Sequence, residues 1–330
     1  MNMQKVLVST HSFGKYSEEP EKILTQRGLD VIRVEKYPAK KEEDYLPYLD
    51  SDVVAIIHAG GCIGRTVMTA APNLKIIAKH GIGVDDIDLE FARENNILVT
   101  NAPGALTNCV ADGAFAIMMA IARRIPQADR CLKEGGWNAI SFFGSAIYGR
   151  TIGIIGMGNI GKGMVHRAKG FNMKLLGYDP YWDETFAKEH GVIRCELDEL
   201  LQKADYVTIH APLTHDTENI IGERELKLMK KTAFLINASR GAMIVDSALY
   251  KALSEKWIAG AALDAFRKEP IDPKDPLLTL ENIVVTPHMA GYDDQGMTLC
   301  SMSAAQSVVK ALFEPKPSVK PPWVVVDANY

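Results

Sequence analysis

The sequence has no long hydrophobic run and no excess of positive charge. A membrane-spanning helix needs about 18 consecutive apolar residues, and no such run occurs among the 330 residues of the chain. The opening segment, residues 1–9, is too short for the core of a signal peptide. With a formal net charge of −4, the chain lacks the basic surface that nucleic acid or an anionic membrane binds. We therefore expect a cytoplasmic protein with no nucleic-acid and no membrane partner.

Cysteine is also scarce, and its pattern excludes two classes of small protein. The five cysteines are scattered, odd in number and nowhere spaced as C-x-x-C, which argues against a disulfide framework and against a zinc cage. The histidines also lack the spacing of metal ligands, so we expect no metal site. The thiols are expected to be buried: Cys62, Cys109, Cys131, Cys195 and Cys300.

The first hundred residues alternate between two kinds of segment. Short runs rich in β-branched residues are separated by polar stretches of helical character, which predicts a small parallel α/β domain. With 47% hydrophobic and 24% charged residues, the chain is long enough for a second domain with its own core. The predicted strands lie at 5–9, 31–34, 53–57 and 75–78, and the helical stretches include 18–27 and 86–95.

A long apolar segment follows this domain. Residues 107–124 are small and apolar nearly all round, as in a buried helix, and we expect them to form the crossing between two domains. A second helical segment, 127–134, leads to two glycines and Trp137. This excursion is either an arm that packs on a second subunit or a segment that packs on its own chain.

Residues 151–163 carry three glycines spaced as G-x-G-x-x-G between an isoleucine-rich strand and a helix. Gly156 permits the sharp turn, Gly158 lets backbone amides approach a pyrophosphate, and Gly161 lets the helix pack against the strand. The helix N-terminus favours the negative charge of such an anion. Asp179 ends the next strand, where a carboxylate can bind a ribose diol and would repel a 2′-phosphate. We therefore predict NAD, rather than NADP, as the cofactor.

The rest of the chain continues the alternation. Four further β-rich runs, at 206–210, 233–237, 258–263 and 283–286, predict a second doubly wound sheet. Residues 293–313 then predict an amphipathic helix, and 321–326 predict a strand that rejoins the first domain.

Polar side chains follow the strands of the second sheet, where open α/β sheets bind ligands. Arg240 has a planar guanidinium that suits two-point binding of a carboxylate beside a carbonyl, although a surface arginine is an equal alternative. His288 can exchange a hydroxyl proton near neutral pH. Glu269 can hydrogen-bond that imidazole and raise its pKa. Asp264 is the fourth such position.

The loop from Lys79 to Asp85 directly follows a predicted strand of the first domain. Its glycines can expose backbone amides to an anion at the end of a sheet. A flexible loop between a strand and a helix has the same composition, and the residues by themselves leave both interpretations open.

Taken together, the segments 156–161, 179, 237–241, 264–270 and 287–291 resemble the motifs of the D-isomer-specific 2-hydroxyacid dehydrogenase family. The resemblance covers essentially the whole chain. It implies an α/β fold of two doubly wound domains: a Rossmann NAD-binding domain at 104–299, inserted into a flavodoxin-like substrate domain made of 1–103 and 300–330. It also implies a homodimer, with the dimerisation arm near 107–150.

The same resemblance implies roles for single residues. Arg240 would bind the substrate carboxylate and keto oxygen, Glu269 would orient the base, and His288 would exchange the hydroxyl proton. The implied cofactor-binding residues are Gly156, Gly158, Asn159, Ile160, Gly161, Asp179, Ala211, Pro212, Ala238, Ser239, Asp264, which would hold the nicotinamide carboxamide, and Gly291. The implied substrate-binding residues are Arg240 and His288 together with His58, Ala59, Lys79, His80, Gly81, Ile82 and Gly83.

The segments 12–16, 101–104 and 123–128 resemble the phosphoglycerate dehydrogenase branch of the family, so D-3-phosphoglycerate is the leading candidate substrate. That branch often has arginines for the phosphate where this chain has residues 57–61 and Lys79. Lysine binds phosphate as a point charge, with less geometric restriction. Asp112 is a smaller departure, since the family usually has glutamate there. Because the chain ends at Tyr330, we expect no regulatory domain and no control by serine through one.

Two other functions fit the same residues. A reductase of glyoxylate, hydroxypyruvate or another small 2-keto acid would share every catalytic residue and differ only in the substrate pocket. A non-catalytic NAD(H)-sensing binding protein could keep the same fold and residues, because fold does not fix function. Binding of a peptide partner without turnover of any 2-keto acid would indicate the second.

Overall fold

The computed structural model describes residues 3–35, 41–315, 321 and 323–326. The chain divides into two compact units, the first made of 1–106 with 292–330 and the second of 107–291. The expected boundaries lay at 103/104 and 299/300. The second boundary differs because helix α11, Asp294–Phe313, is continuous and packs against α1 and β4 of the first unit, so a boundary at residue 300 would cut it.

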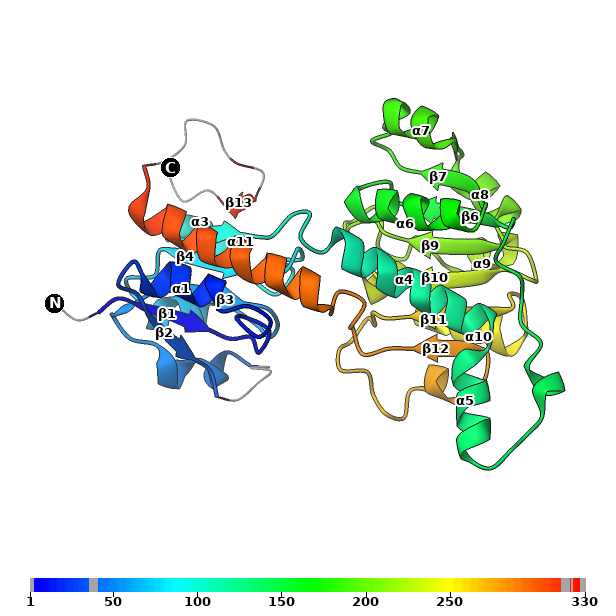
Figure 1. Cartoon of the computed structure of the whole chain (residues 1–330), viewed down its shortest axis with the longest axis horizontal. Helices are drawn as coiled ribbons and strands as arrows, with labels where there is room; N and C mark the ends of the chain where they lie inside the picture. Colours follow the sequence, from blue (N-terminus) through cyan, green and yellow to red (C-terminus); the bar gives the residue numbers. More distant parts are fainter. Residues whose placement is uncertain (1–2, 36–40, 316–320, 322, 327–330) are drawn as a thin grey trace. The chain divides into compact units, whose positions relative to one another are not determined.

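The first unit is built on a six-stranded sheet in the order β13-β5-β4-β3-β1-β2 (Figure 1). All neighbouring strands are parallel except β13, which runs antiparallel to β5. The order of the parallel strands is that of flavodoxin-like folds. Their bounds are β1 Lys5–Val8, β2 Asp30–Arg33, β3 Val53–His58, β4 Ile76–Lys79, β5 Leu98–Thr100 and β13 Val324–Val326.

Helices cover both faces of this sheet, because its central strands are apolar on both sides. On one face, α1 (Glu19–Thr25) and α11 bury Leu24, Ala305 and Val308 against the strands. On the other face lie α2 (Arg65–Ala70), α3 (Leu89–Glu94) and the short 3₁₀ helices Glu42–Asp44 and Leu46–Tyr48. Helix α3 begins later than predicted because the carboxylate of Asp88 caps it, accepting from the Phe91 amide at 2.9 Å.

The second unit has a seven-stranded sheet, parallel throughout, in the order β12-β11-β10-β9-β6-β7-β8. This is the Rossmann order extended by one strand. The short strand β8 was not predicted from the sequence, and neither was β5 of the first unit. The bounds are β6 Thr151–Ile155, β7 Lys174–Tyr178, β8 Val192–Arg194, β9 Tyr206–Ile209, β10 Phe234–Asn237, β11 Gly260–Leu263 and β12 Ile283–Val285.

Its helices also form two layers. Helices α4 (Thr107–Ala122), α6 (Asn159–Gly170) and α7 (Glu184–His190) pack on one face, and α8 (Leu197–Lys203), α9 (Glu223–Leu228) and α10 (Asp246–Ser254) pack on the other. Helix α5 (Ile125–Lys133) follows α4, and the 3₁₀ helices are Ala139–Phe142, Gly241–Met243 and Pro276–Thr279. The predicted crossing helix thus belongs wholly to the second unit as α4.

Two sequence-based expectations concern single residue types. Cys109, Cys195 and Cys300 are buried, but Cys62 is exposed and Cys131 is intermediate, so the expectation of buried thiols was wrong for these two. Across the described ranges, no three or more His, Cys, Asp or Glu side chains are grouped to hold a metal ion. None of the helices in those ranges is both long and apolar enough to span a bilayer.

Candidate active site

The glycine-rich turn after β6 has the geometry that its sequence predicts. Gly156 has a φ of +91°, a conformation that favours glycine, and a Cβ there would lie 2.5 Å from the Ala211 amide nitrogen. A Cβ on Gly161 would lie 2.0 Å from the carbonyl oxygen of Gly156. Gly158 is different, because nothing lies within 4 Å of its Cβ position, and it caps the N-terminus of α6 with Asn159 exposed beside it. The turn therefore leaves room for a pyrophosphate at the helix N-terminus.

Asp179 follows β7 at the edge of this turn. Its carboxylate accepts from the Met157 amide and from the Tyr181 amide, both at 2.7 Å. The two bonds orient the carboxylate beside the glycine-rich turn, at the position that recognises a ribose diol in Rossmann folds.

The residues after β10 form a loop that carries Arg240 and is held by several hydrogen bonds. Asn237 accepts from the Ser239 amide at 3.0 Å and donates to the carbonyl of Arg240 at 2.8 Å. The Ser239 hydroxyl donates to the carbonyl of Ala211, at the end of β9, at 2.7 Å. Gly241 lies against the backbone of Phe266, since a Cβ there would lie 2.0 Å from its carbonyl carbon. These contacts fix the backbone from which the half-buried guanidinium of Arg240 projects.

Asp264, at the end of β11, anchors the loop that carries His288. Its buried carboxylate accepts from the Thr286 hydroxyl at 2.5 Å and from the amides of Met289 and Ala290, each at 2.8 Å. Both oxygens are thus used to shape the loop after β12. The sequence predicted a contact from Asp264 to the nicotinamide and gave no signal for this anchoring, which depends on residues more than twenty positions away.

His288 and Glu269 form the pair that the sequence predicted. Nδ1 of His288 lies 2.7 Å from Oε2 of Glu269, and the other Glu269 oxygen accepts from the Phe266 amide at 2.9 Å. His288 has a φ of +53°, an uncommon conformation for a residue other than glycine. Such a backbone conformation is unfavourable, and the hydrogen bonds from the loop to Asp264 help to maintain it at His288.

The electrostatics of the pair follow from its contacts. The hydrogen bond with Glu269 raises the pKa of His288, while burial acts in the opposite direction. Burial favours a higher pKa for Glu269, but the hydrogen bonds from His288 and the Phe266 amide outweigh it and lower the pKa. The positive charge of Arg240 also acts on both groups, so the structure brings all three predicted catalytic residues within electrostatic range.

The first unit contains a second polar cluster, which the sequence indicated only in part. His58, the last residue of β3, is fully buried, and its Nε2 lies 2.9 Å from Oδ2 of Asp86. Its Nδ1 lies 3.1 Å from the Ser9 hydroxyl and 3.2 Å from the Tyr45 hydroxyl. Lys79, buried at the end of β4, donates to the same oxygen of Asp86. Asp86, Ser9 and Tyr45 were missed because they lie on separate loops and elements.

Burial dominates the titration of this cluster. It lowers the pKa of His58, and the charge of Lys79 lowers it further. Burial favours a higher pKa for Asp86, but the interactions with His58 and Lys79 outweigh it and bring the pKa to about 2. Burial also raises the pKa of Tyr45. At neutral pH the cluster therefore holds a charged Asp86 beside a neutral imidazole.

His80 begins the loop predicted to bind the substrate carboxylate. Its ring is buried, and its Nε2 lies 2.9 Å from the Ser301 hydroxyl of α11. Burial lowers its pKa to about 4. Ala59, Ile82 and Gly83 are partly exposed, and Gly81 is buried with a φ of +158°. Of the cofactor-binding residues predicted on the second unit, Pro212 is exposed and Ile160, Ala211, Ala238 and Gly291 are partly exposed.

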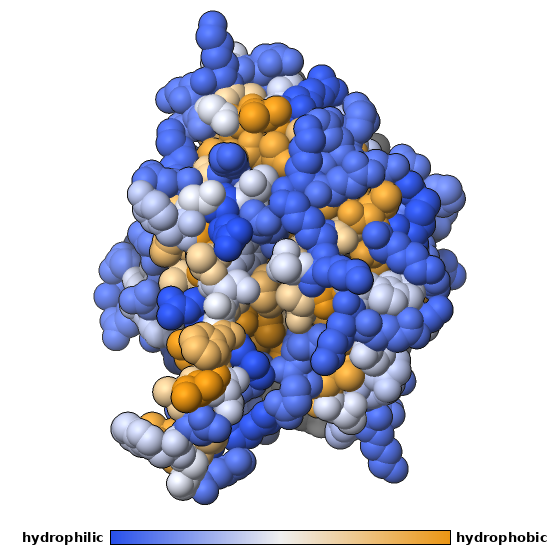
Figure 2. Space-filling view, turned by 90° about the vertical axis from the view of Figure 1, so that its right-hand side faces the viewer, coloured by the Kyte–Doolittle hydropathy of each residue, from blue (hydrophilic) through white to orange (hydrophobic). Residues whose placement is uncertain are grey.

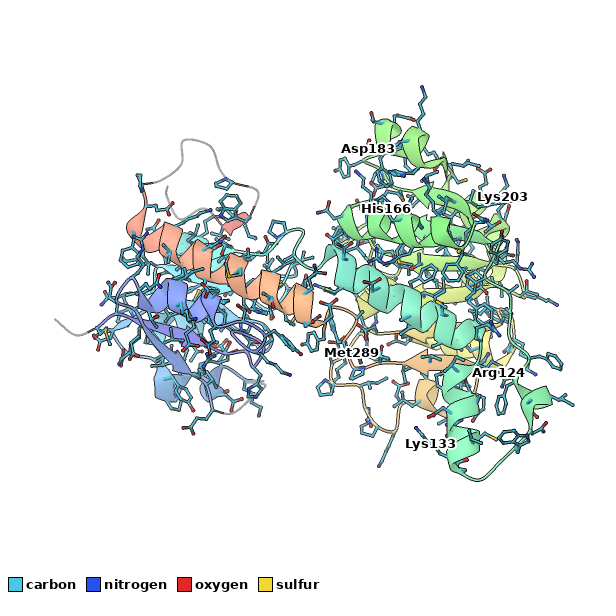
Figure 3. The ribbon with its side chains drawn as sticks, viewed as in Figure 1. Arg124, Lys133, His166, Asp183, Lys203 and Met289 are labelled. Carbon is cyan, nitrogen blue, oxygen red and sulfur yellow. The ribbon has the colours of Figure 1, made fainter. Side chains whose placement is uncertain are left out.

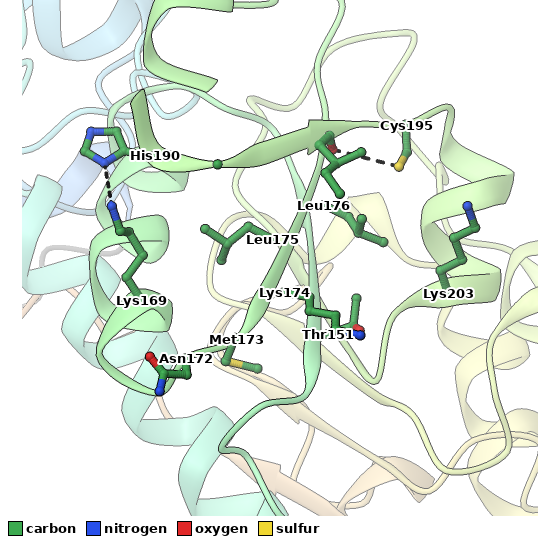
Figure 4. A pocket seen from close by; sticks show the side chains of 12 residues that line it. Thr151, Lys169, Asn172, Met173, Lys174, Leu175, Leu176, His190, Cys195 and Lys203 are labelled. Atoms are coloured by element: carbon green, nitrogen blue, oxygen red, sulfur yellow. Dashed lines mark hydrogen bonds between the residues drawn. The ribbon is translucent and has the colours of Figure 1, made fainter. Parts of the chain in front are cut away.

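A cavity of the second unit lies away from these residues. It has a volume of about 590 Å³ and is lined by Thr151, Lys174, Lys169, His190 and Lys203, among others (Figure 4). Thr151 and Lys174 are the first residues of their strands. In Figure 3, Lys203 lies toward one end of the strands, and Met289 lies toward the other end, to which the strands point. The cavity therefore lies at the opposite end of the strands from the His288 loop, and open α/β sheets bind their ligands at the carboxyl ends.

Comparison with known proteins identifies the class and then the family. The model described as "D-isomer specific 2-hydroxyacid dehydrogenase, NAD binding domain" matches residues 115–290. A glyoxylate reductase of Korarchaeum cryptofilum is 47% identical over 251 residues, covering 75% of this chain and 76% of the relative. A D-3-phosphoglycerate dehydrogenase of Methanocaldococcus jannaschii is 40% identical over 312 residues, covering 94% of this chain and 58% of the relative. The crystal structure of the TT0316 protein of Thermus thermophilus has a TM-score of 0.86 at 32% identity and covers 98% of this chain and 100% of that one.

The two doubly wound sheets, the glycine-rich turn and these matches define an NAD-dependent oxidoreductase that acts on CH–OH groups. The chain belongs to the D-isomer-specific 2-hydroxyacid dehydrogenase family. The predictions of family, fold class, NAD binding and enzyme class are thereby confirmed. The chain spans just over half the length of the phosphoglycerate dehydrogenase relative.

Proposed function

We propose that the chain reduces a small 2-keto acid to the D-2-hydroxy acid, and oxidises it in reverse, through His288, Glu269 and Arg240. The observation that carries the proposal is the 2.7 Å contact between Nδ1 of His288 and Glu269. A carboxylate on Nδ1 fixes a proton there, which leaves Nε2 as the ring nitrogen that exchanges a proton with substrate.

The chemistry follows from these positions. Bound NADH supplies the hydride that reaches C2 of the keto acid. Protonated His288 gives the keto oxygen its proton, and Glu269 stabilises the imidazolium from which that proton leaves. Arg240 binds the substrate carboxylate and polarises the carbonyl. In oxidation, neutral His288 takes the hydroxyl proton instead.

The second unit fits the cofactor. Gly158 and the N-terminus of α6 leave open space for the pyrophosphate, and Asp179 lies beside them for the adenosine ribose. The same carboxylate would repel a 2′-phosphate, which supports NAD over NADP. The predicted contacts of Asn159, Ser239 and Asp264 with the cofactor remain part of this proposal.

Two substrate classes are candidates. The 47% identity to a glyoxylate reductase supports glyoxylate, hydroxypyruvate or a similar acid. The match to a D-3-phosphoglycerate dehydrogenase, which covers 94% of this chain, supports 3-phosphohydroxypyruvate. In either case the loop from His80 to Gly83 is proposed to bind the substrate carboxylate through its backbone amides.

The experiment is NADH oxidation with glyoxylate, hydroxypyruvate, 3-phosphohydroxypyruvate and pyruvate. The wild-type chain should turn over at least one of these acids, and His288→Ala should lower kcat/KM by about 10²- to 10⁴-fold, as expected for loss of general acid catalysis. His215→Ala, at an exposed histidine, is the matched control. NADH binding without turnover of any acid would overturn the proposal in favour of a cofactor-sensing protein.

We also propose a homodimer formed through α5 and the residues after it. Helix α5 is tied to its own unit, since Gln127 donates to the Glu281 carbonyl at 3.0 Å. The segment that follows exposes Trp137, Ile140 and Phe143, each more than 75% accessible. In Figure 2, hydrophobic surface appears on the projection at the lower left, at the height at which Figure 1 draws α5. Exposed apolar clusters of this kind mark interaction sites.

Light scattering on the whole chain tests the dimer. The wild-type mass should be twice that of one chain, and replacing Trp137 and Phe143 by serine should yield monomers. A monomeric wild-type chain at micromolar concentration would contradict the proposal.

A further inference from the structure

The ion pair of Lys79 and Asp86 carries an inference about substrate choice, which rests on the proposed function. Lys79 is 5% exposed and donates to Oδ2 of Asp86, whose side chain is partly buried. Because this environment is less polar than water, the two opposite charges attract each other more strongly than a pair at the surface does. A phosphate that used Lys79 would have to compete with a carboxylate already bound to it.

The neighbouring histidine adds no positive charge. Asp86 accepts from Nε2 of His58, and Nδ1 lies within hydrogen-bond distance of the hydroxyls of Ser9 and Tyr45. The imidazole is fully buried, which disfavours its charged form and lowers the pKa of His58. His58 therefore adds no positive charge to the cluster at neutral pH.

Asp86 also keeps unused acceptor capacity. Among the described residues, its buried Oδ1 accepts no hydrogen bond. The negative charge of Asp86 disfavours a phosphate near Lys79, because like charges repel.

The cluster borders the loop proposed to bind the substrate carboxylate. Cε of Lys79 lies 3.9 Å from the Cβ position of Gly81. At the far end of the loop, the Asp86 carbonyl accepts from the Ile63 amide at 2.9 Å. Lys79 and Asp86 thus lie at the two ends of the loop, and their charges would act on a substrate bound to it.

We propose that Asp86 is a specificity-determining residue, which neutralises Lys79 and thereby selects unphosphorylated 2-keto acids over their phosphorylated counterparts. Neither His58 nor Lys79 then acts as the phosphate contact that the sequence suggested. The enzyme is a reductase of acids such as hydroxypyruvate and glyoxylate.

The test measures one ratio on the whole chain: kcat/KM for 3-phosphohydroxypyruvate divided by kcat/KM for hydroxypyruvate, with NADH. In the wild type the ratio should be below about 0.1, a difference of about 1.4 kcal/mol. Asp86→Asn, which keeps the shape but removes the negative charge, should raise the ratio about tenfold or more. Asp85→Asn, the same change at the adjacent exposed position, should leave it unchanged.

A double variant keeps the test decisive if Asp86→Asn alone fails to fold, which circular dichroism would show. Lys79→Gln with Asp86→Asn removes both charges, so the ratio should stay within about threefold of the wild type. A tenfold fall in that variant would show that Lys79 binds the phosphate and would overturn the inference.

The remaining outcomes separate this inference from the proposed function. A wild-type ratio above 1, or an Asp86→Asn ratio no higher than that of Asp85→Asn, would overturn the inference while the dehydrogenase function stands. Failure to turn over any of the acids would overturn both.

Discussion

The Glu269 carboxylate lies 2.7 Å from Nδ1 of His288 and is itself held by the amide of Phe266. One carboxylate therefore both orients the imidazole and raises its pKa. The acid form of His288 consequently persists to higher pH than that of an ordinary histidine, which favours reduction in neutral solution.

Replacing Glu269 by glutamine tests this relationship through the pH profile of keto-acid reduction. Reduction needs protonated His288, so kcat/KM falls as pH rises through the raised pKa. Without the carboxylate that pKa drops, and the falling limb should move to lower pH, with kcat reduced by about 10²-fold. Glu255→Gln, on an exposed loop, is the control. An unmoved limb would mean that another group titrates.

The open space around Gly158 predicts a separation of cofactor binding from stability. Gly158→Ala should leave the melting temperature unchanged, because nothing lies within 4 Å of the added Cβ. The methyl group would occupy the pyrophosphate position, and the Kd for NADH should rise about tenfold or more. Gly170→Ala, at the other end of α6 and equally open, should leave that Kd as it is. Equal effects of the two variants on the Kd would contradict this placement of the pyrophosphate.

Asp179 is expected to set the preference between NADH and NADPH. Asp179→Asn retains an acceptor for the Met157 amide but removes the charge that repels a 2′-phosphate. The ratio of kcat/KM for NADH over NADPH should fall by about tenfold. Asp216→Asn, at a fully exposed carboxylate, gives the baseline. The prediction fails if both variants keep the wild-type ratio.

Buried His210 predicts a loss of stability in acid. Its Nε2 lies 2.8 Å from the Thr208 hydroxyl, and burial lowers the pKa of His210 to about 3. The unfolded chain takes up a proton below about pH 6.5 while the folded chain does not, so stability falls as pH drops from about 6.5 toward 3. Between pH 6.5 and 4.5 this amounts to roughly 2–3 kcal/mol.

Melting temperatures measured across that pH interval provide the check. His210→Gln should show a shallower fall than the wild type, whereas His215→Gln, at an exposed site, should show the wild-type slope. Parallel curves for wild type and His210→Gln would exclude His210 as the source of the acid sensitivity.

The sequence predicted those parts of the fold and site whose physical cause is local. Gly156 and Gly161 could be assigned because a turn and a close helix–strand contact admit few other residues. Most strands and helices were found within a few positions, since burial on both faces gives continuous apolar runs. Strands β5 and β8 were missed because each has only three residues, and only the first residue of β8 is buried.

The rest depended on contacts between distant segments. No sequence spacing predicts that Lys79 lies near His58, or Asp86 near Tyr45. These residues come together only because of the order of the strands in the sheet and the positions of the loops between them. The anchoring of the His288 loop by Asp264 is of the same kind, as is the left-handed backbone of His288 itself. Such relationships appear only when the sheet order is known.

The hydrogen bond between Cys109 and Gly291 has a consequence for the folding of the chain. The second unit begins at residue 107 and ends at 291, and the Cys109 thiol donates to the Gly291 carbonyl at 3.4 Å. Nearby, the Cβ position of Gly113 falls 2.6 Å from Cα of Ala290. The entry and exit of the inserted unit thus meet at one point. In an unfolded chain, the entropic cost of bringing two points together grows with the number of residues between them. Because the folded second unit holds its own two ends together, its 185 residues add little of that cost to the folding of the first unit.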